Sequence, residues 1–279
     1  MDILQNYQKK LFPYAYNILG SVEDALDVVQ DVVVSFLESD LHKVNNYSAY
    51  LIKSVVNKSI NLKKRSRKIA GDLTWLPEPI ATENADNTIN TKEIISYSMM
   101  VLLEYLNPKE RAVFILKSAF DYSHQEIAEL FSISVDNSKQ LLSRAKRVLK
   151  ERGSDFRLKG YSSNVFLSTY INVIKSGDVK KLEELLAENI ITCAGGGGKV
   201  KDIEFTGGVN DVALLLVRGY ELYLKKFRIE FKDVNNSRAI LFYKNSTLIG
   251  CQLLDIDAET NKIFNIYFIA DRKKLKGLF

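Results

Sequence analysis

Cysteine and histidine are scarce in this chain of 279 residues, which contains two of each. Cys193 and Cys251 are far apart in the sequence and form no C-x-x-C pair, and no Cys/His spacing typical of zinc binding occurs. A disulfide framework is therefore not expected, and two isolated cysteines suit a reducing cytosol. We predict no metal and no cofactor.

Long apolar segments are also absent. No run approaches the ~18 residues that a membrane-spanning helix needs, and the start of the sequence, MDILQNYQKKLF, lacks a basic stretch followed by an apolar core. We expect neither a membrane segment nor a signal peptide, and hence a cytoplasmic protein. With 46% apolar and 26% charged residues the chain is typical of folded domains, and its length suits two or three of them.

Residues 1–68 contain a single proline and a single glycine, and their apolar residues recur at spacings of three and four. This periodicity is typical of amphipathic helices. Gly20 and Ser21 separate a first helix from a second, for which Ser21 is the expected N-cap. A further helix is predicted over about 47–67.

The last two of these helices differ in charge. The helix after Ser21 carries carboxylates beside a wide apolar stripe, a combination typical of a protein-binding surface. The helix over 47–67 is basic, with no acidic residue between positions 41 and 71, so a polyanion is its natural partner. Tyr47, Tyr50 and interleaved asparagines suit unstacked single-stranded bases. An ordinary solvated face is the alternative for each helix.

Residues 121–150 have the spacing of a helix-turn-helix. A short helix is predicted over 122–131, followed by the turn Ser132–Ser134 and a second helix over 135–150. Ser134 is the expected N-cap of the second helix. Ala128 is small where the two helices must cross closely. The polar side of the second helix would read base edges, and its basic residues would contact phosphates. A two-helix hairpin with a solvated basic face is the alternative.

Residues 69–95 contain two of the four prolines, and TENADNTINT within them is poor in apolar residues, so a linker is predicted. Trp75-Leu76-Pro77-Glu78-Pro79 is one apolar cluster inside this linker. After about residue 160 helices are expected at about 162–176, 178–188 and 208–224, and four segments rich in β-forming residues follow them.

The glycine-rich run Cys193–Val200 invites comparison with a phosphate-binding Walker loop. It lacks the first glycine and the final Ser or Thr of that motif, and no strand-to-helix context surrounds it, so we reject a nucleotide site. Two interpretations are left: a flexible connecting loop, or a segment where another part of the chain approaches the backbone closely.

Three blocks resemble extracytoplasmic-function sigma factors in order and spacing, and they cover roughly the first 152 residues. Residues 21–31 resemble the family's core-polymerase-binding helix, and residues 50–67 resemble the helix that opens and reads the −10 element. Residues 106–114, with the helix-turn-helix behind them, resemble the module that reads the −35 element. Ser132 departs from the pattern, since glycine is common at this turn position. The resemblance implies an alternative sigma factor that directs promoter-specific transcription initiation.

The cluster Trp75–Pro79 and the extra C-terminal domain resemble the subgroup whose sigma modules are fused to a SnoaL-like domain of the nuclear-transport-factor cone fold. This implies a multidomain chain with two all-α sigma modules, region 2 at 1–68 and region 4 at 96–153, joined by a linker at 69–95. An α+β cone-shaped SnoaL-like domain is expected at 160–279. The resemblance also implies that this domain modulates sigma activity in cis and that its glycine-rich motif faces the linker or the sigma modules.

The predicted functional residues form three groups. The residues expected to bind core polymerase are Asp24, Asp27, Val28, Gln30 and Asp31. Those expected to contact promoter DNA are Tyr50, Lys53, Asn57, Asn61, Lys64 and Arg65 for the −10 element and Asn137, Lys139, Gln140, Ser143, Arg144 and Arg147 for the −35 element. The interdomain regulatory residues are Trp75, Leu76, Pro77, Gly196, Gly197 and Lys199.

The partners implied are core RNA polymerase and promoter DNA, with no membrane. Catalysis is not expected, because His42 and His124 both lie in the sigma portion and leave only ordinary groups such as Asp202 or Asp255 for acid–base chemistry. A small-molecule pocket in the C-terminal domain stays open. Two other functions remain as alternatives: a ligand-sensing helix-turn-helix regulator that acts without polymerase, and a SnoaL-like enzyme with a DNA-binding appendage.

Overall fold

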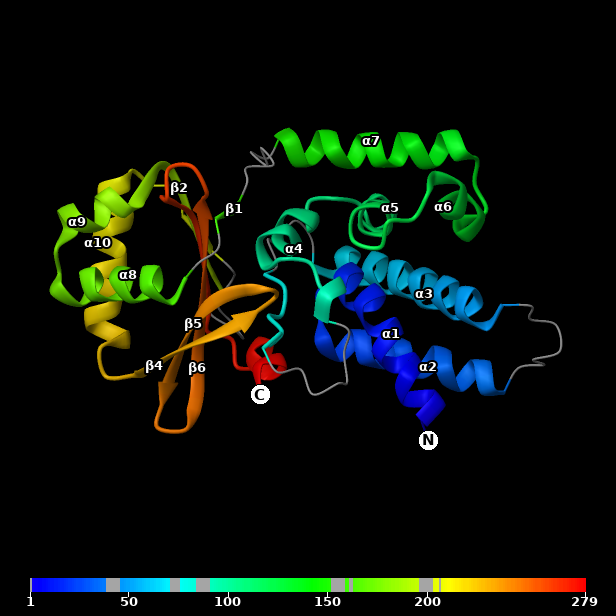
Figure 1. The fold of residues 1–279 in the computed structure, drawn as a ribbon, viewed down its shortest axis with the longest axis horizontal. Helices are drawn as coiled ribbons and strands as arrows, with labels where there is room; N and C mark the ends of the chain where they lie inside the picture. The colour runs from blue at the N-terminus through cyan, green and yellow to red at the C-terminus, as the bar shows by residue number, and fades with distance from the viewer. Residues whose placement is uncertain are drawn as a thin grey trace. The chain divides into compact units, whose positions relative to one another are not determined.

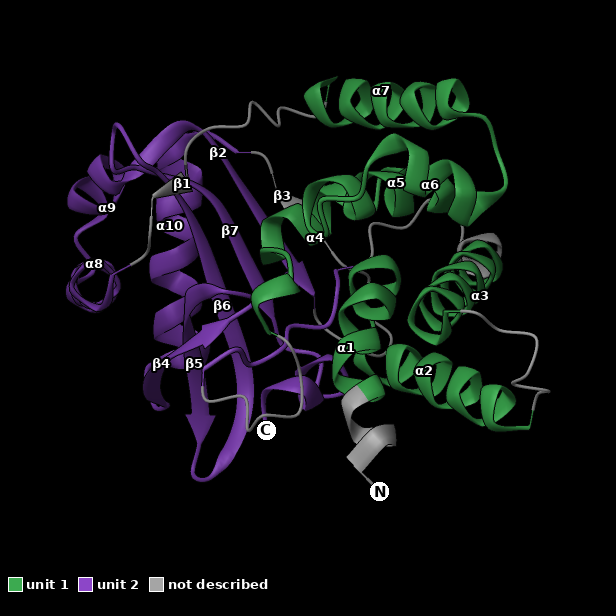
Figure 2. Ribbon diagram, turned by 45° about the vertical axis from the view of Figure 1, so that its right-hand side comes forward, with its two compact units in different colours: residues 1–72, 84–155 green, residues 73–83, 156–279 purple. Residues whose placement is uncertain are grey.

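The computed structural model describes residues 2–38, 46–70, 76–83, 91–151, 159–160, 163–195, 203–205 and 207–279. The chain divides into two compact units (Figure 2). Unit 1 comprises residues 1–72 and 84–155, and unit 2 comprises residues 73–83 and 156–279. The chain therefore enters unit 2 briefly, returns to unit 1, and enters unit 2 a second time.

Unit 1 is built from helices in its described part (Figure 1). Their bounds are α1 (Asp2–Leu19), α2 (Val22–Leu37), α3 (Tyr47–Ala70), η2 (Thr91–Glu93), α4 (Tyr97–Leu103), α5 (Pro108–Ser118), α6 (His124–Phe131) and α7 (Val135–Glu151). Gly20, with φ 74°, ends α1 in the left-handed region that glycine adopts without strain. Ser21 caps α2 as predicted, because its Oγ accepts a hydrogen bond from the Asp24 N–H at 3.3 Å.

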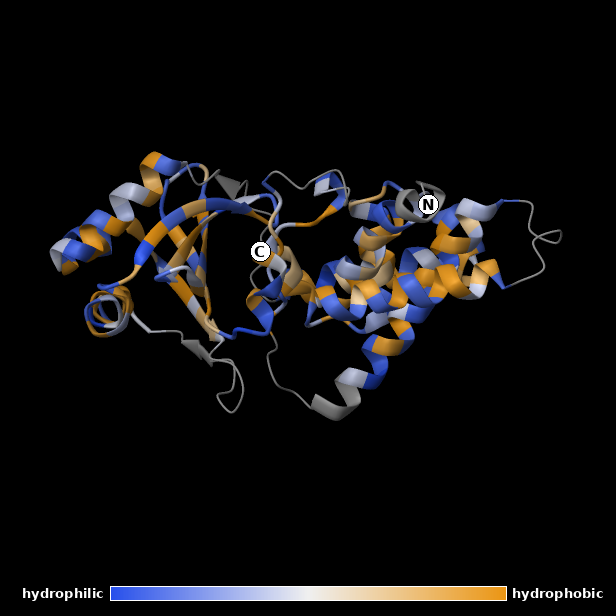
Figure 3. Ribbon diagram, turned by 90° about the horizontal axis from the view of Figure 1, so that it is seen from below, coloured by the Kyte–Doolittle hydropathy of each residue, from blue (hydrophilic) through white to orange (hydrophobic). Residues whose placement is uncertain are grey.

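Amphipathic faces bring these helices together. Figure 3 shows hydrophobic and hydrophilic residues alternating along them, as buried and solvated faces require. α1, α2 and α3 contact one another, and α5 contacts α1 and α3 as well as α7. α5 thus links the N-terminal three-helix group to the helix-turn-helix, and a direct contact between α3 and α6 adds to this link.

Unit 2 is an α+β fold with one mixed sheet in the order β3-β2-β7-β6-β5-β4, to which β1 adds through β6. The strands are β1 (Lys159–Gly160), β2 (Leu186–Gly195), β3 (Ile203–Phe205), β4 (Arg228–Val234), β5 (Ser237–Lys244), β6 (Thr247–Asp257) and β7 (Ile263–Ile269). The helices are α8 (Asn164–Ser176), α9 (Val179–Leu185), α10 (Val209–Gly219), η3 (Tyr220–Leu224) and η4 (Lys274–Leu278). β2 and β7 are parallel, and the other pairs are antiparallel.

One prediction about unit 2 is wrong. The helix expected over 178–188 ends at Leu185, and the next ten residues form strand β2, which was not predicted. Pairing with the distant strand β7 satisfies the backbone of this segment, and such a long-range contact leaves no local signal in the sequence. Cys193–Gly195 end this strand, whereas 196–200, including Gly196, Gly197 and Lys199, lie outside the described residues.

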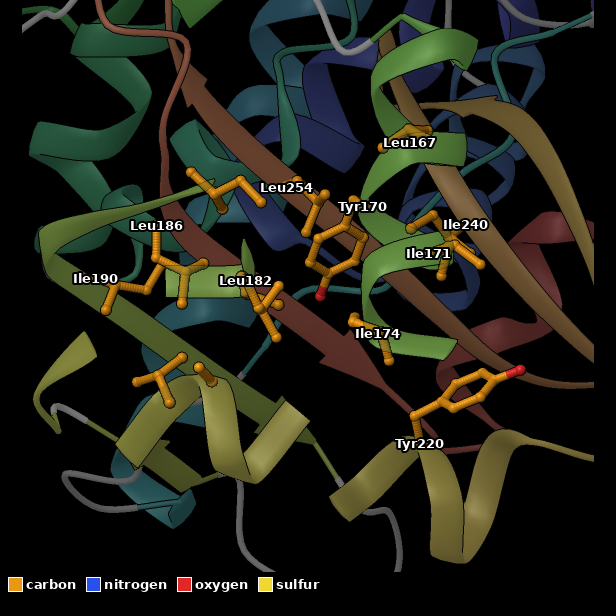
Figure 4. Close-up of a cluster of buried hydrophobic side chains, with 14 of the residues drawn as sticks. Leu167, Tyr170, Ile171, Ile174, Leu182, Leu186, Ile190, Tyr220, Ile240 and Leu254 are labelled. Carbon is orange, nitrogen blue, oxygen red and sulfur yellow. The ribbon is translucent and has the colours of Figure 1, made fainter. Parts of the chain in front are cut away.

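Four strands follow α10 and η3 as expected, and asparagines with positive φ form their turns at Asn235, Asn236 and Asn245. Side chains from α8 and α9 fill a core against the sheet, where Tyr170, Leu182 and Leu254 point toward one another (Figure 4). The Tyr170 hydroxyl accepts a hydrogen bond from Gln252 Nε2 at 3.3 Å, and burial raises the pKa of this phenol. A neutral, satisfied hydroxyl at this depth is a structural group.

Two kinds of feature are missing from the described parts of the chain. None of their helices is long and apolar enough to cross a bilayer. They also contain no group of three or more His, Cys, Asp or Glu side chains arranged to bind a metal ion.

Two substitutions on α8 test this core. Leu167 is fully buried and Val165 is 76% exposed on the same helix. Leu167→Ala should lower the free energy of unfolding of unit 2 by about 2–5 kcal/mol, because it removes apolar contacts and leaves a cavity. Val165→Ala should change it by less than about 0.5 kcal/mol. Hydrogen exchange of the β5 and β6 amides measures both, and equal effects would contradict the described packing.

Candidate promoter-binding and polymerase-binding surfaces

Reciprocal caps fix the geometry of the helix-turn-helix. Ser123 Oγ accepts from the Glu126 N–H at 3.1 Å, and Glu126 Oε2 accepts from the Ser123 N–H at 2.7 Å, which completes a capping box at the start of α6. Ser134 Oγ accepts from the Asn137 N–H at 3.1 Å and begins α7 as predicted. A 3.0 Å hydrogen bond between His124 Nδ1 and Ser138 Oγ joins the two helices directly.

The predicted −35 residues lie on one solvated face of α7. All six are exposed: Asn137, Lys139, Gln140, Ser143, Arg144 and Arg147. The opposite face is buried and includes Leu142, Ala145 and Leu149. Burial, and then the nearby charges of Lys117, Lys139 and Lys146, lower the pKa of His124. The three lysines give the surroundings of this motif positive charge, which favours contact with DNA phosphates.

The predicted −10 residues follow one face of α3. Tyr50, Lys53, Asn57, Asn61 and Lys64 recur at helical spacing and, with the neighbouring Arg65, are exposed or half-buried. Lys53 Nζ donates a hydrogen bond to the Glu129 carbonyl oxygen of α6 at 3.5 Å.

Aromatic rings stand at the start of this face. The ring of buried Phe36 lies 5.4 Å from that of Tyr47 and 5.9 Å from that of Tyr50, between centroids. Both tyrosines remain about two-fifths exposed, at 43% and 42%. Phe36 therefore holds two partly open aromatic surfaces beside the basic helix.

The acidic face of α2 is largely as expected. Asp24, Asp27, Gln30 and Asp31 are exposed, and Asp31 forms an ion pair with Lys58 at 2.7 Å. Partial burial, and then the charge of Asp27, raise the pKa of Asp24.

Val28 is the exception among the predicted polymerase-binding residues. It is only 3% exposed and is one of the buried residues of α2. It packs inside the helical unit because α2 turns its apolar stripe, to which Val28 belongs, inward.

The predicted linker is in part a component of unit 2. Ala81 forms an antiparallel bridge with Val234 at the end of β4. Asn235 binds both polar groups of Ile80: its N–H donates to the Ile80 carbonyl and its Oδ1 accepts from the Ile80 N–H, each at 2.9 Å. The Ala81 N–H donates to the Gly277 carbonyl at 3.0 Å, so the C-terminal η4 also holds this segment.

A charged contact continues this attachment. Glu83 pairs with Arg238 at 2.8 Å, and Arg238 also pairs with Asp233 at 3.0 Å and donates from Nε to Asn164 Oδ1 at 2.7 Å. The hydrogen bond from Arg238 lowers the pKa of Glu83, so the pair is ionised at neutral pH and weakens only as the pH falls through that lowered value. Leu76 and Pro77 are buried, and Trp75 lies outside the described residues.

Unit 1 contains a buried group of charges that was not predicted as a site. Arg111 is fully buried, pairs with Glu104, and donates to the Asn17 carbonyl from Nε at 3.0 Å and from Nη2 at 2.9 Å. Lys63 Nζ donates to the Leu19 carbonyl at 2.8 Å and pairs with Glu104 Oε2 at 2.8 Å. We call Asn17, Lys63, Glu104 and Arg111 the inter-region cluster, because it joins α1 and α3 to α5 and the turn before it.

Comparison with known proteins identifies the class. The Sigma-70 region 2 family matches residues 3–69, and the Sigma-70 region 4 family matches residues 97–149. The two helical modules of unit 1 thus correspond to the two DNA-reading regions of sigma-70-type transcription factors, a family that binds core RNA polymerase and promoter DNA.

Individual relatives show to which group of sigma factors the chain is similar. The ECF RNA polymerase sigma factor SigJ of Mycobacterium tuberculosis is 31% identical over 150 residues, which are 51% of this chain and about half, 47%, of SigJ. The probable ECF RNA polymerase sigma factor SigI of the same organism is 22% identical over 277 residues, covering 96% of this chain and 92% of SigI. The chain belongs to the extracytoplasmic-function sigma factors.

A solved structure agrees in fold. The crystal structure of M. tuberculosis SigJ matches with a TM-score of 0.75 and 22% identity, over 99% of this chain and 98% of that chain. This likeness confirms the predicted fold class, in which helical sigma regions 2 and 4 precede an α+β domain, and it is consistent with a SnoaL-like unit 2.

Ser132 provides a stability test of the turn. Its φ of 52° is left-handed, a conformation that costs residues other than glycine about 1–2 kcal/mol. Ser132→Gly should therefore raise the free energy of unfolding by about 0.5–1 kcal/mol after the entropy cost of glycine is included. Ser132→Ala is the control and should give no gain. Urea denaturation followed by helical circular dichroism measures both, and a less stable glycine variant would contradict the described turn.

Proposed function

We propose that this alternative sigma factor binds core RNA polymerase through α2, reads the −10 element through α3 and the −35 element through α7, and is modulated in cis by unit 2. The observation that carries the proposal is that two exposed faces rich in basic and amide side chains lie within the two matched sigma regions. In this reading region 2 occupies 1–68 and region 4 occupies 96–153, and the protein acts in the cytoplasm, where core polymerase transcribes.

The −35 face combines two kinds of contact. Amide and hydroxyl groups of Asn137, Gln140 and Ser143 suit base edges in the major groove. Lys139, Arg144 and Arg147 suit phosphates, which set position and affinity without reading sequence. Because α7 buries its apolar side in unit 1, its exposed side is free to enter a groove.

The −10 face suits an opened strand. Tyr50 offers a ring on which a base can stack, and Lys53, Lys64 and Arg65 line the path of the backbone. Asn57 and Asn61 add donors and acceptors for exposed base edges. Single-strand contacts of this kind favour the melted form of the −10 element over the duplex, which is the form that initiation needs.

Core polymerase would contact the acidic side of α2. Asp24 and Asp27 place like charges close together, and their repulsion adds to the effect of partial burial in raising the pKa of Asp24. A basic partner surface would relieve it. Asp31, already paired with Lys58, contributes less net charge to this surface.

Regulation in cis would act through the attached linker. With residues 76–83 held by unit 2, six residue steps connect Ala70 to Leu76 and eight connect Glu83 to Thr91, so about 22 and 29 Å of fully extended chain remain at the two ends. A freely moving linker would let regions 2 and 4 separate independently of unit 2. Because the linker is attached to unit 2, the separation of regions 2 and 4 depends on unit 2. The proposed regulatory residues are Trp75, Leu76 and Pro77 in the linker and Gly196, Gly197 and Lys199 in the glycine-rich segment.

Two α7 variants separate base reading from phosphate binding. Gln140→Ala should cost about 1–3 kcal/mol on the preferred promoter and relax preference at one −35 position. Arg147→Ala should weaken holoenzyme binding alike on all −35 sequences and reduce the slope of log K against log salt by about one. Holoenzyme titrations at several salt concentrations measure both. A shallow slope for the unaltered protein would contradict the assignment of α7.

A second pair tests the linker attachment. Arg238→Ala removes the partner of Glu83, so the linker should be released more often and initiation from core polymerase should rise about two- to tenfold. Arg228→Ala is the control, because Arg228 pairs with Glu230 within β4 and not with the linker. In vitro transcription at matched protein concentrations measures both. Equal transcript output from Arg238→Ala and the unaltered protein would contradict the proposal that this contact regulates initiation.

A further inference from the structure

Helix α10 of unit 2 and the turn η3 that follows it carry an exposed apolar face, which we call the α10 face. Leu215 is 49% exposed, Leu222 73% and Tyr223 71%, and Gly219 lies between them in the sequence. These positions recur at helical spacing, whereas Val212, on the other side of the helix, is buried in the core of unit 2. Large apolar side chains gathered on one exposed face are typical of a surface that a partner covers.

The turn η3 has π-helical geometry and turns two of these side chains outward. The Lys225 N–H donates to the Tyr220 carbonyl at 2.8 Å, which is the i to i+5 bond of a π turn. Tyr220 at the start of this turn is buried, whereas Leu222 and Tyr223 after it both face solvent. Single π turns are rare and are frequent at functional sites. The turn is therefore a second observation in favour of a binding surface.

Gly219 makes the middle of the α10 face shallow. Its φ of −60° and ψ of −41° are ordinary helical values that any residue adopts, so the backbone does not require glycine here. A Cβ added at this position would meet nothing within 4 Å beyond the adjoining helical backbone. Glycine inside a helix costs about 0.5–1 kcal/mol relative to alanine, and the described part of the chain gives no steric reason for it. A second helix packed closely against this point would give one.

The two ends of the α10 face carry opposite charges. Asp211 lies in the first turn of α10, Lys226 follows η3, and both are exposed. The neighbouring Lys225 pairs with Glu221 at 3.9 Å within the same turn. A second copy of the face in antiparallel orientation would bring opposite charges together at both ends, whereas a parallel copy would bring like charges together.

The spacing along the sequence fits the same antiparallel arrangement. Leu215 and Leu222 are equally far from the point between positions 218 and 219, and Asp211 and Lys226 are equally far from it at a greater distance. Antiparallel packing about this point places Leu215 opposite Leu222 of the second copy. It also places Asp211 opposite Lys226 of the second copy, and Gly219 next to the centre of the contact. The face is therefore complementary to itself in both shape and charge.

We propose that the α10 face joins two copies of this chain into a two-fold symmetric dimer through antiparallel packing of α10 and η3. A two-fold interface uses the same patch on both copies, so a self-complementary face is what it requires. One pair of short helices buries less than the ~800 Å² per partner of standard interfaces, so the dimer should dissociate on dilution. None of the residues assigned to polymerase, promoter DNA or the linker belongs to the α10 face. The inference is therefore independent of the proposed function.

Sedimentation velocity of the whole chain over a range of concentrations measures this association. The weight-average mass should rise with concentration from that of one chain towards that of two. Leu222→Asp should lower the association constant about tenfold or more, because it places a charge in the apolar centre of the contact. Val165→Asp is the matched control and should leave association unchanged, since Val165 is 76% exposed on α8, outside the α10 face.

An exchange of charges tests the antiparallel arrangement. Asp211→Lys and Lys226→Asp should each weaken association about three- to tenfold, because each brings like charges together at both symmetric ends. The double variant should restore association, since it recreates the opposite-charge pairs. Gly219→Leu should weaken association by holding the two helices apart.

Three results would overturn the proposal, provided that circular dichroism shows the variants to be folded. The first is a monomer at every concentration. The second is equal association of Leu222→Asp and Val165→Asp. The third is a double charge variant that associates no better than the two single variants.

Discussion

The buried guanidinium of Arg111 is the constraint on which the arrangement of unit 1 depends. An arginine remains charged at any pH at which the protein is folded, so its complete burial requires a carboxylate and enough acceptors for its N–H groups. Glu104 supplies the carboxylate from the same module, but the Asn17 carbonyl that takes two of the donors belongs to α1. The pairing of Arg111 is therefore complete only when regions 2 and 4 are packed together.

The linker segment attached to unit 2 meets the same requirement, namely that its polar groups have hydrogen-bond partners. A linker segment laid against a sheet must satisfy its backbone groups, and residues 80–82 do so through Asn235, Asp233 and Gly277. The left-handed conformation of Asn235, with φ 48°, lets its main chain and side chain face the same linker residue. The C-terminal η4 completes the attachment, so the β4–β5 turn and the C-terminal end of unit 2 both hold a segment that precedes region 4.

Local features of the sequence predicted what depends on local physics. The helices of unit 1, the caps at Ser21 and Ser134 and the four final strands all follow from periodicity and capping chemistry. The solvated faces of α3 and α7 follow from the same periodicity, although the DNA contacts assigned to them remain predictions. Val28 shows the limit of this reasoning, since a block of sequence that resembles a binding helix contains both exposed and buried positions.

Features that depend on distant pairing were missed. Strand β2 forms because β7 lies beside it, and no feature of the sequence Leu186–Gly195 indicates that partner. Arg111 and Asn17 are 94 positions apart, and Glu83 and Arg238 are 155 apart, so each looks like an ordinary charged or polar surface residue in the sequence. No local pattern distinguishes Lys63, which is buried and paired with Glu104, from Lys64, which is exposed.

The central claim is that this chain directs core RNA polymerase to particular promoters through two promoter-reading modules. The most direct test is in vitro transcription with the purified protein, core polymerase from its host and a genomic promoter pool. The account predicts new start sites that share a two-part upstream sequence, with the parts spaced like −35 and −10 elements. Tight, specific duplex binding by the protein alone, with no new start site in the presence of core polymerase, would contradict the account.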